Sequence, residues 1–163
     1  ILWVGALEHG ADASFSFRKN LVLELSKRSN AKLYGCCGRD KIGGMDALYA
    51  ISGARIGVSV NAYEGVRLAH SNRLIGFLAG GTFVLSNRFP GCELLYQDSK
   101  HLKYFDTIEE FFDLVDYYLE HEQERRKIAD AGMKHVHENF NSEKTAGYFL
   151  ELIENGKYSA PWT

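Results

Sequence analysis

The sequence has 163 residues, of which 45% are hydrophobic and 25% are charged, so it can bury a core and is neither disordered nor fibrous. One domain takes ~100–200 residues, and this length therefore excludes a large multidomain machine. The formal net charge of -2 argues against a general nucleic-acid or anionic-membrane surface. Any anion that the protein binds must therefore be held locally, by a few suitably positioned groups.

The elements of the first half alternate between short β-rich runs and segments of helical period, which is typical of a parallel sheet covered on both faces. We expect strand 1–5, helix 16–29, strand 31–35, helix 45–52 and strand 55–60. In the first of these helices, Phe17, Leu21, Leu25 and Arg28 lie along one stripe.

The stretch 66–90 carries the strongest helix signals. Ser71 or Asn72 is a good N-cap, and the pair Gly80-Gly81 ends the helix before another strand. The amino end of this helix therefore points toward the loop that follows strand 55–60. The elements expected next are strand 82–86, a helical turn at 91–96 and strand 102–105.

The remainder is helical. Thr107 and Glu110 form a capping box, and two more helices are expected at 122–139 and 142–153. Glu122 and Arg126 are spaced four apart and most simply form a solvated pair. The sequence therefore predicts an α/β class, a Rossmann-like, doubly wound parallel sheet flanked by helices, with a helical C-terminal tail.

Cysteine usage and apolar runs define the expected setting of the chain. Three cysteines cannot complete a disulfide framework, and the adjacent Cys36 and Cys37 suit neither a metal knuckle nor an ordinary bridge, so we expect a cytoplasmic protein. The longest apolar runs fall well short of the ~20 residues of a transmembrane segment. The first five residues, ILWVG, resemble a core strand without an initiator Met. We expect one domain, 1–163, cut from a longer protein.

Open parallel sheets bind ligands at the carboxyl ends of their strands. The loop after strand 55–60 leads into a helix start, whose free N–H groups and dipole suit a diphosphate, and Arg73 adds a bidentate cation there. The alternative is that Ser71 only caps the helix and Arg73 faces water. The candidate diphosphate ligands are Gly5, Arg18, Arg39, His70, Ser71, Asn72 and Arg73. The candidate base, ribose or sugar ligands are Asn61, Tyr63, Glu64 and Glu93.

Several common signatures are absent from the sequence. There is no GxGxxG after the first strand, no GxxxxGK[ST], no GxSxG and no HExxH, which weakens dehydrogenase, P-loop, hydrolase and metalloprotease readings. Five histidines are expected at the surface or at helix ends rather than as metal ligands: His9, His101, His121, His135 and His137. No catalytic residue is assigned.

From residue 71 onward the chain resembles the carboxy-terminal domain of GT-B glycosyltransferases, in particular the group related to the spore-maturation protein CgeB and the glycosyl transferases group 1 domains. The matching motifs are Arg73 at the helix start, the small-residue turn 79–81, Gly-x-Glu-Leu at 91–94, Tyr104 with 107–110, and Arg-x-x-Ile-Ala-x-x-Gly around 126–132. The strand ends at 4–5, 34–35 and 59–61 also fall where that family has them.

The resemblance implies a metal-independent domain that binds a nucleoside-diphosphate sugar and helps transfer the sugar to an acceptor glycan or another hydroxyl. A separate amino-terminal domain would carry the acceptor, and no nucleic acid is involved. The sequence departs from the family in one respect. Retaining members have an E-x7-E motif, and its two Glu positions are occupied here by Leu68 and Gly76. Glu64 or Glu93 could substitute. The alternatives are a degenerate nucleotide-sugar-binding or scaffold domain and a sugar-nucleotide epimerase. A flavodoxin-like response module is a third, but the acidic cluster that such a module needs at its strand ends is missing near Gly5 and Val60.

Overall fold

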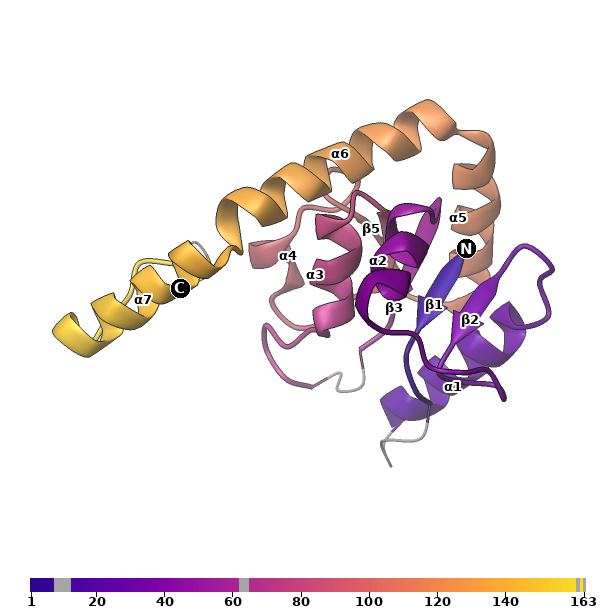
Figure 1. Cartoon of the computed structure of the whole chain (residues 1–163), viewed down its shortest axis with the longest axis horizontal. Coiled ribbons are helices and arrows are strands. Elements are labelled where there is room, and N and C mark those ends of the chain that lie inside the picture. The colour runs from indigo at the N-terminus through magenta and orange to yellow at the C-terminus, as the bar shows by residue number, and fades with distance from the viewer. Residues whose placement is uncertain (8–12, 62–64, 161, 163) are drawn as a thin grey trace.

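The computed structural model describes residues 1–7, 13–61, 65–160 and 162. Its five strands are parallel and form one sheet in the order β2-β1-β3-β4-β5 (Figure 1). They are β1 (Leu2–Val4), β2 (Lys32–Tyr34), β3 (Ile56–Ser59), β4 (Phe83–Asn87) and β5 (Lys103–Phe105). The predicted α/β, Rossmann-like, doubly wound fold is confirmed.

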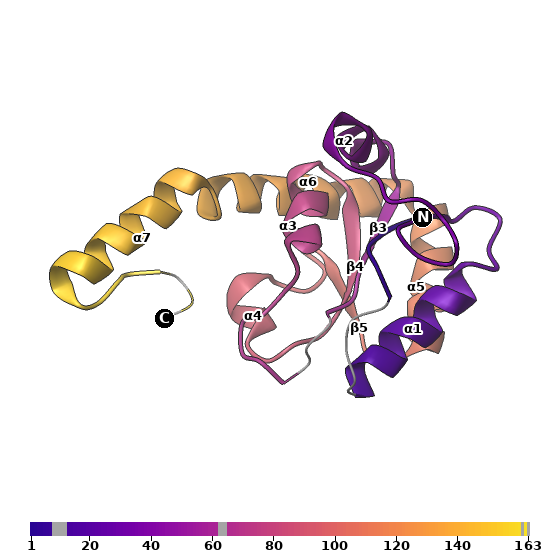
Figure 2. The ribbon, with the colours of Figure 1, turned by 60° about the horizontal axis from the view of Figure 1, so that its bottom comes forward.

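Helices cover both faces of the sheet. They are α1 (Ala13–Leu25), α2 (Gly44–Ser52), α3 (Asn72–Ala79), α4 (Cys92–Leu95), α5 (Ile108–Glu120), α6 (Glu122–Asn139) and α7 (Ser142–Asn155). Figure 2 shows α1 and α5 on one side of the sheet and α3 and α4 on the other. Two apolar clusters fill these layers, one with α1 and α5 around Trp3 and one with α3 around Phe77. Because β3 and β4 lie between both clusters, all of their residues are buried.

Helix α1 differs from its predicted bounds, since it runs from Ala13 to Leu25 instead of from 16 to 29. After Leu25 the chain tightens into a turn, in which the N–H groups of Lys27 and Arg28 bond carbonyls three residues back. Arg28 therefore leaves the helix stripe. Its guanidinium pairs with Asp116 of α5 and lies over the Phe112 ring, 4.8 Å from the ring centroid.

The capping box before α5 is confirmed with one change in its partners. Thr107 Oγ1 accepts the Glu110 N–H at 3.1 Å. The Glu110 carboxylate reaches one residue further back than expected and accepts the Asp106 N–H at 2.7 Å. The Glu122–Arg126 pair is solvated, as predicted, with the side chains 51% and 73% exposed.

The prediction of a surface or helix-end position is wrong for His101. His101 is only 7% exposed, and its ring stacks on that of His135 with centroids 4.0 Å apart. The stack exists because α6 packs tightly here: a Cβ on Gly132 would lie 2.2 Å from the His101 carbonyl oxygen. The predicted helix face of α6 did not reveal this partner, since it belongs to a turn distant in the sequence.

Helices α2 and α7 contain no buried residue. Each instead exposes large apolar side chains, and α7 extends away from the sheet (Figure 1). These side chains are Met45, Leu48 and Tyr49 on α2 and Phe149, Leu150, Leu152 and Ile153 on α7. No helix in the described part of the chain is both long enough and apolar enough to cross a bilayer.

Candidate functional site

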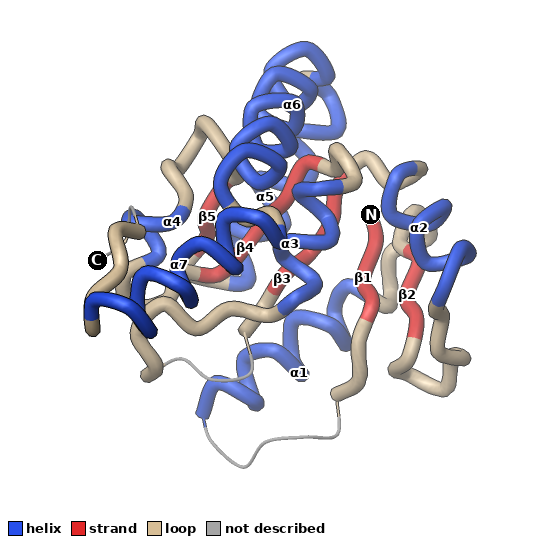
Figure 3. The backbone as a smooth tube through the Cα atoms, turned by 60° about the vertical axis from the view of Figure 1, so that its left-hand side comes forward, coloured by secondary structure: helices blue, strands red, loops and turns tan. Residues whose placement is uncertain are grey.

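The candidate site lies where β1 and β3 end side by side. Strand β1 connects through α1 to β2 on one side of the site. Strand β3 connects through α3 to β4 on the other side, so the strand order reverses between β1 and β3 (Figure 3). Ligands of doubly wound sheets bind in the crevice outside such a switch point.

Arg73 reaches from the first turn of α3 back over both strand ends. Its Nη1 donates to the Val4 carbonyl at 2.8 Å and its Nη2 to the Val60 carbonyl at 3.2 Å. The guanidinium also lies over the Trp3 ring, 4.1 Å from the centroid. Burial, together with the nearby Arg18, lowers the pKa of Arg73 to about 9, which still leaves it charged near neutral pH.

Arg18 approaches the same place from α1. Its Nη2 donates to the Ala6 carbonyl at 2.6 Å, and its guanidinium lies on Trp3 with the ring centroid 5.1 Å away. Trp3 is fully buried and donates its indole N–H to the Gly5 carbonyl at 2.9 Å. The indole therefore holds both guanidiniums through cation–π contacts.

Gly5 occupies the space between the two arginines. A Cβ there would lie 2.7 Å from Arg73 Nη1 and 3.3 Å from Arg18 Nη2, and the φ of +148° also favours glycine. Among the described residues, no ion pair includes Arg18 or Arg73. Two like charges therefore face one point without a carboxylate, and burial of an uncompensated charge is costly.

Unsatisfied polar atoms concentrate at this site. Five buried side-chain N or O atoms of the described residues lack a hydrogen-bond partner, and four of them belong to Arg18, Ser59, Ser71 and Arg73. Buried polar atoms are normally bonded, so a cluster of exceptions points to a group that is bound there in the working protein. An oxyanion could accept from the arginines and the Ser71 hydroxyl together.

Asn61 and Asn87 fix the start of α3. The Asn61 N–H donates to Asn87 Oδ1 at 2.9 Å, and Asn61 Oδ1 accepts the Ser71 N–H at 3.3 Å while its Nδ2 donates to the Ala69 carbonyl at 3.2 Å. Asn61 therefore uses its amide within the protein and positions the helix, whereas we expected it to contact base, ribose or sugar. Ser71 is the N-cap residue, but its side chain forms no cap bond.

His70 was expected among the phosphate ligands, and its surroundings limit that role. The ring packs against Phe89 and Tyr96, with centroids 5.8 and 5.7 Å away. Burial lowers the pKa of His70, so the ring is neutral near pH 7 and brings no positive charge to a phosphate.

The other predicted ligands lie further out or cannot be placed. Asn72 is exposed at the first turn of α3, and Arg39 is exposed beside the buried Cys36. Glu93 is exposed on α4, where its carboxylate contacts the Cys92 thiol at 3.7 Å, and it lies apart from the arginine pair. Tyr63 and Glu64 fall outside the described residues.

Sequence reasoning missed Trp3 and Asn87. Trp3 was placed in a core strand, and nothing in a strand pattern shows that two cations lie on the ring. Asn87 was placed just outside strand 82–86, and its partner Asn61 comes from another loop. A hollow of about 850 Å³ between α2 and the first two strands is lined by none of the predicted ligands.

Comparison with models of protein families shows to which family the chain belongs. The glycosyl transferase-like family model matches residues 18–151. The chain belongs to this family. A comparison with curated protein sequences gives no significant match. The matched range contains Arg18, Arg73 and all elements from β2 to α6, and so covers most of the candidate site.

Solved structures of glycosyltransferases share the fold. Sucrose-phosphate synthase from Thermosynechococcus elongatus aligns with a TM-score of 0.67 and 17% identity over 94% of this chain and 44% of its own. Anabaena HepE in complex with UDP-glucose aligns with a TM-score of 0.64 and 11% identity over 85% of this chain and 37% of its own. The C-terminal domain of the group 1 protein LpcC from Francisella tularensis aligns with a TM-score of 0.55 and 14% identity over 81% of this chain and 66% of its own. The chain thus corresponds to the C-terminal half of GT-B enzymes and spans about two fifths of the first two relatives.

The two positions of the expected Glu motif are both unusual. Leu68 adopts a φ of +61°, which is rare for a branched side chain, and packs against Gly91. Gly76 lies in the middle of α3, and a Cβ there would meet nothing within 4 Å. The helix therefore leaves open space where a carboxylate would stand.

Proposed function

We propose that this chain is the donor-binding domain of a glycosyltransferase and holds the diphosphate of a nucleotide sugar between Arg18, Arg73 and the start of α3. The observation that carries the proposal is the pair of guanidiniums that converge on Gly5 and form no ion pair with any carboxylate of the described residues. Family membership and the UDP-glucose bound to HepE, a protein of the same fold, support the choice of ligand.

The same groups suit the chemistry of glycosyl transfer. As the bond between sugar and diphosphate breaks, negative charge grows on the leaving diphosphate, and preorganised cations lower the energy of that state. The first N–H groups of α3 have no acceptor inside the helix and add the favourable end of its dipole. Because the protein itself supplies two cations, we expect nucleotide binding to persist in the presence of EDTA. The acceptor and the catalytic base would come from a second domain.

Isothermal titration calorimetry with UDP, GDP, ADP, CMP and dTDP tests the proposal. For the nucleotide that binds, Arg73→Met is expected to weaken affinity at least tenfold, about 1.4 kcal/mol. The same change is expected to lower the free energy of unfolding by about 1–3 kcal/mol, because the Val4 and Val60 carbonyls lose their donors, so circular dichroism must first show that the variant is folded.

Arg126→Met is the matched control, since Arg126 is exposed on α6 and pairs with the solvated Glu122. It should leave affinity unchanged. An Arg73→Met variant that binds as tightly as the wild type would remove the phosphate assignment.

A non-catalytic nucleotide-sugar-binding domain is the second candidate, and Leu68 and Gly76 favour it. In the family that the chain resembles, a Glu at position 76 bonds the ribose. The open space around Gly76 admits that side chain, so Gly76→Glu is expected to tighten nucleoside-diphosphate binding up to about tenfold, the value of one hydrogen bond to a charged group. Calorimetry of this variant is the measurement, and unchanged affinity would show that the ribose lies elsewhere.

A further inference from the structure

A second, smaller cavity opens at the same edge of the sheet, where β4 and β5 end. It has a volume of about 290 Å³ and is lined by Phe17, Asn87, Arg88, Phe105 and Asp106. Ligand sites for larger molecules span ~300–1,000 Å³, so this cavity has room for one ring rather than a whole nucleotide. Of its lining residues only Asn87 also serves the diphosphate site, where its Oδ1 accepts the Asn61 N–H at the start of α3.

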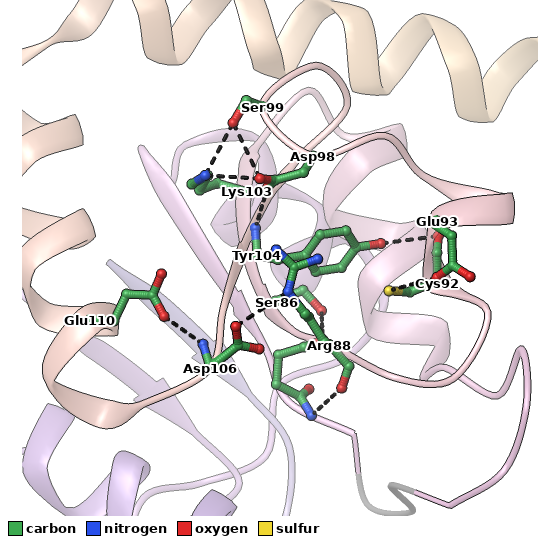
Figure 4. A network of polar contacts seen from close by, with 11 residues as sticks. Ser86, Arg88, Cys92, Glu93, Asp98, Ser99, Lys103, Tyr104, Asp106 and Glu110 are labelled. Carbon is green, nitrogen blue, oxygen red and sulfur yellow. Dashed lines mark hydrogen bonds and ion pairs between the residues drawn. The ribbon is translucent and has the colours of Figure 1, made fainter.

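Arg88 and Asp106 give this cavity a polar wall (Figure 4). Arg88 Nε lies 3.3 Å from Asp106 Oδ2, and both side chains remain accessible, with 49% and 60% exposed. The Arg88 guanidinium is steadied over the Tyr104 ring, 5.0 Å from its centroid. Within the described residues, its terminal amino groups and Asp106 Oδ1 have no other hydrogen-bond partner. The pair therefore presents donors and an acceptor side by side.

Phe17 supplies an apolar wall to the same cavity. Its ring is partly exposed and stacks on the buried Phe105 with centroids 6.3 Å apart. A pyranose has an apolar C–H face and a rim of hydroxyl groups, each both donor and acceptor. An aromatic ring beside a guanidinium–carboxylate pair matches both surfaces, whereas a phosphate would be repelled by Asp106.

The position of the cavity relates it to the arginine pair. Neighbouring strands lie ~4.8 Å apart, so the ends of β4 and β5 are roughly 10–15 Å from the end of β1, where Gly5 lies, and roughly 5–10 Å from the end of β3, where Arg73 contacts the Val60 carbonyl. This is the reach of a sugar attached to a diphosphate. The two places are also built together, because Phe17 precedes Arg18 on α1 and Asn87 holds Asn61 at 2.9 Å.

We propose that the Phe17–Arg88–Asp106 cavity binds a hexose ring, that of the nucleotide sugar whose diphosphate lies between Arg18 and Arg73. The proposal rests on the proposed function and adds a separate sugar-recognising site to it. Asp106 accepts from sugar hydroxyls, Arg88 donates to them, and Phe17 covers one face of the ring.

The test compares UDP with UDP-glucose, UDP-galactose and UDP-N-acetylglucosamine by calorimetry on the wild type, Asp106→Asn and Phe17→Leu. If another nucleotide from the panel binds instead, its own sugars replace these. Both variants are expected to weaken the preferred nucleotide sugar about tenfold and to leave the free nucleoside diphosphate within twofold. Asp113→Asn is the matched control, because Asp113 is exposed on α5 outside the cavity. It should change neither affinity.

Three outcomes would overturn the proposal. Equal loss for nucleotide and nucleotide sugar would assign the residues to the diphosphate site, and no loss for either would leave the cavity without a role. The third outcome is binding of a free hexose, which saturation-transfer NMR with glucose, galactose and mannose detects. A free hexose that binds the wild type but not Asp106→Asn, while nucleotide-sugar affinity is unchanged, would make the cavity an acceptor site. Absence of any nucleotide binding by the wild type would instead refute the proposed function itself.

Discussion

Replacing Gly132 by alanine is expected to lower the free energy of unfolding by about 3 kcal/mol, the upper end of typical overpacking costs. The added Cβ would lie 2.2 Å from the His101 carbonyl oxygen and 2.9 Å from Leu78 Cδ2. The first of these neighbours is backbone, which cannot rotate away, so α6 must shift from both the 96–102 turn and α3. The usual gain of about 1 kcal/mol from exchanging glycine for alanine within a helix does not offset this.

Urea denaturation of the purified variant measures the effect. Gly147→Ala is the matched control, because Gly147 also lies within a helix and its Cβ would meet nothing within 4 Å. This control should be more stable than the wild type by about 0.5–1 kcal/mol. Equal stability of the two variants would contradict the tight contact between α6 and His101.

Acid is expected to remove on the order of 3 kcal/mol of stability through the His101–His135 stack. His101 Nδ1 accepts the Gln97 N–H at 3.2 Å, and His135 Nε2 bonds the Leu95 carbonyl at 2.8 Å while its Nδ1 faces the Asn139 amide at 3.2 Å. The Gln97 N–H requires an unprotonated Nδ1 on His101, and a proton there would replace this acceptor by a donor.

The pH range follows from the pKa values. Burial, then the neighbouring His135 and Lys100, lowers the pKa of His101 to about 4, against an ordinary value of 6.5. The unfolded chain therefore binds the proton more readily than the folded one. The stabilisation is complete above about pH 6.5 and is lost as the pH falls toward 4, which at about 1.4 kcal/mol per pKa unit gives the magnitude stated.

Unfolding experiments between pH 4 and 8 on the wild type and His101→Asn measure this slope. An Asn carbonyl can still accept the Gln97 N–H but does not titrate, so the variant should lose the part of the pH dependence that His101 contributes and keep that of His70, whose pKa burial also lowers. His121→Asn, at an exposed position between α5 and α6, should keep it. NMR titration of the ring protons provides a direct check, and a His101 that takes up its proton near pH 6.5 would contradict the prediction.

Local patterns in the sequence predicted the fold well. Strand and helix signals placed the twelve elements that the described residues form, because each depends on the period of its own apolar residues and on caps such as Thr107. Helix α1 was misplaced at both ends, since its stripe of apolar residues continues in register to Arg28 while the backbone has already turned.

The candidate site could be predicted only in part. Gly5, Arg18 and Arg73 were named as candidate ligands from local signals, which are a strand end and two helix starts. The convergence of Arg18, Trp3 and Arg73 depends on three elements meeting at one point, and no single segment encodes that meeting. The buried histidine stack was missed for the same reason, as His101 and His135 become neighbours only when α6 crosses the 96–102 turn.

The guanidiniums of Arg18 and Arg73, which form no ion pair within the described part of the chain, also affect how the proposed nucleotide binding should be assayed in solution. Inorganic phosphate and sulfate carry the same oxygen geometry as a nucleotide diphosphate, and guanidiniums bind both. At a buffer anion concentration 100 times its own dissociation constant, the native state gains about 2.7 kcal/mol, and an added nucleotide must displace that anion. A thermal-shift screen in phosphate buffer would therefore report false negatives, whereas the same screen in an amine buffer with chloride leaves the pair open to its ligand.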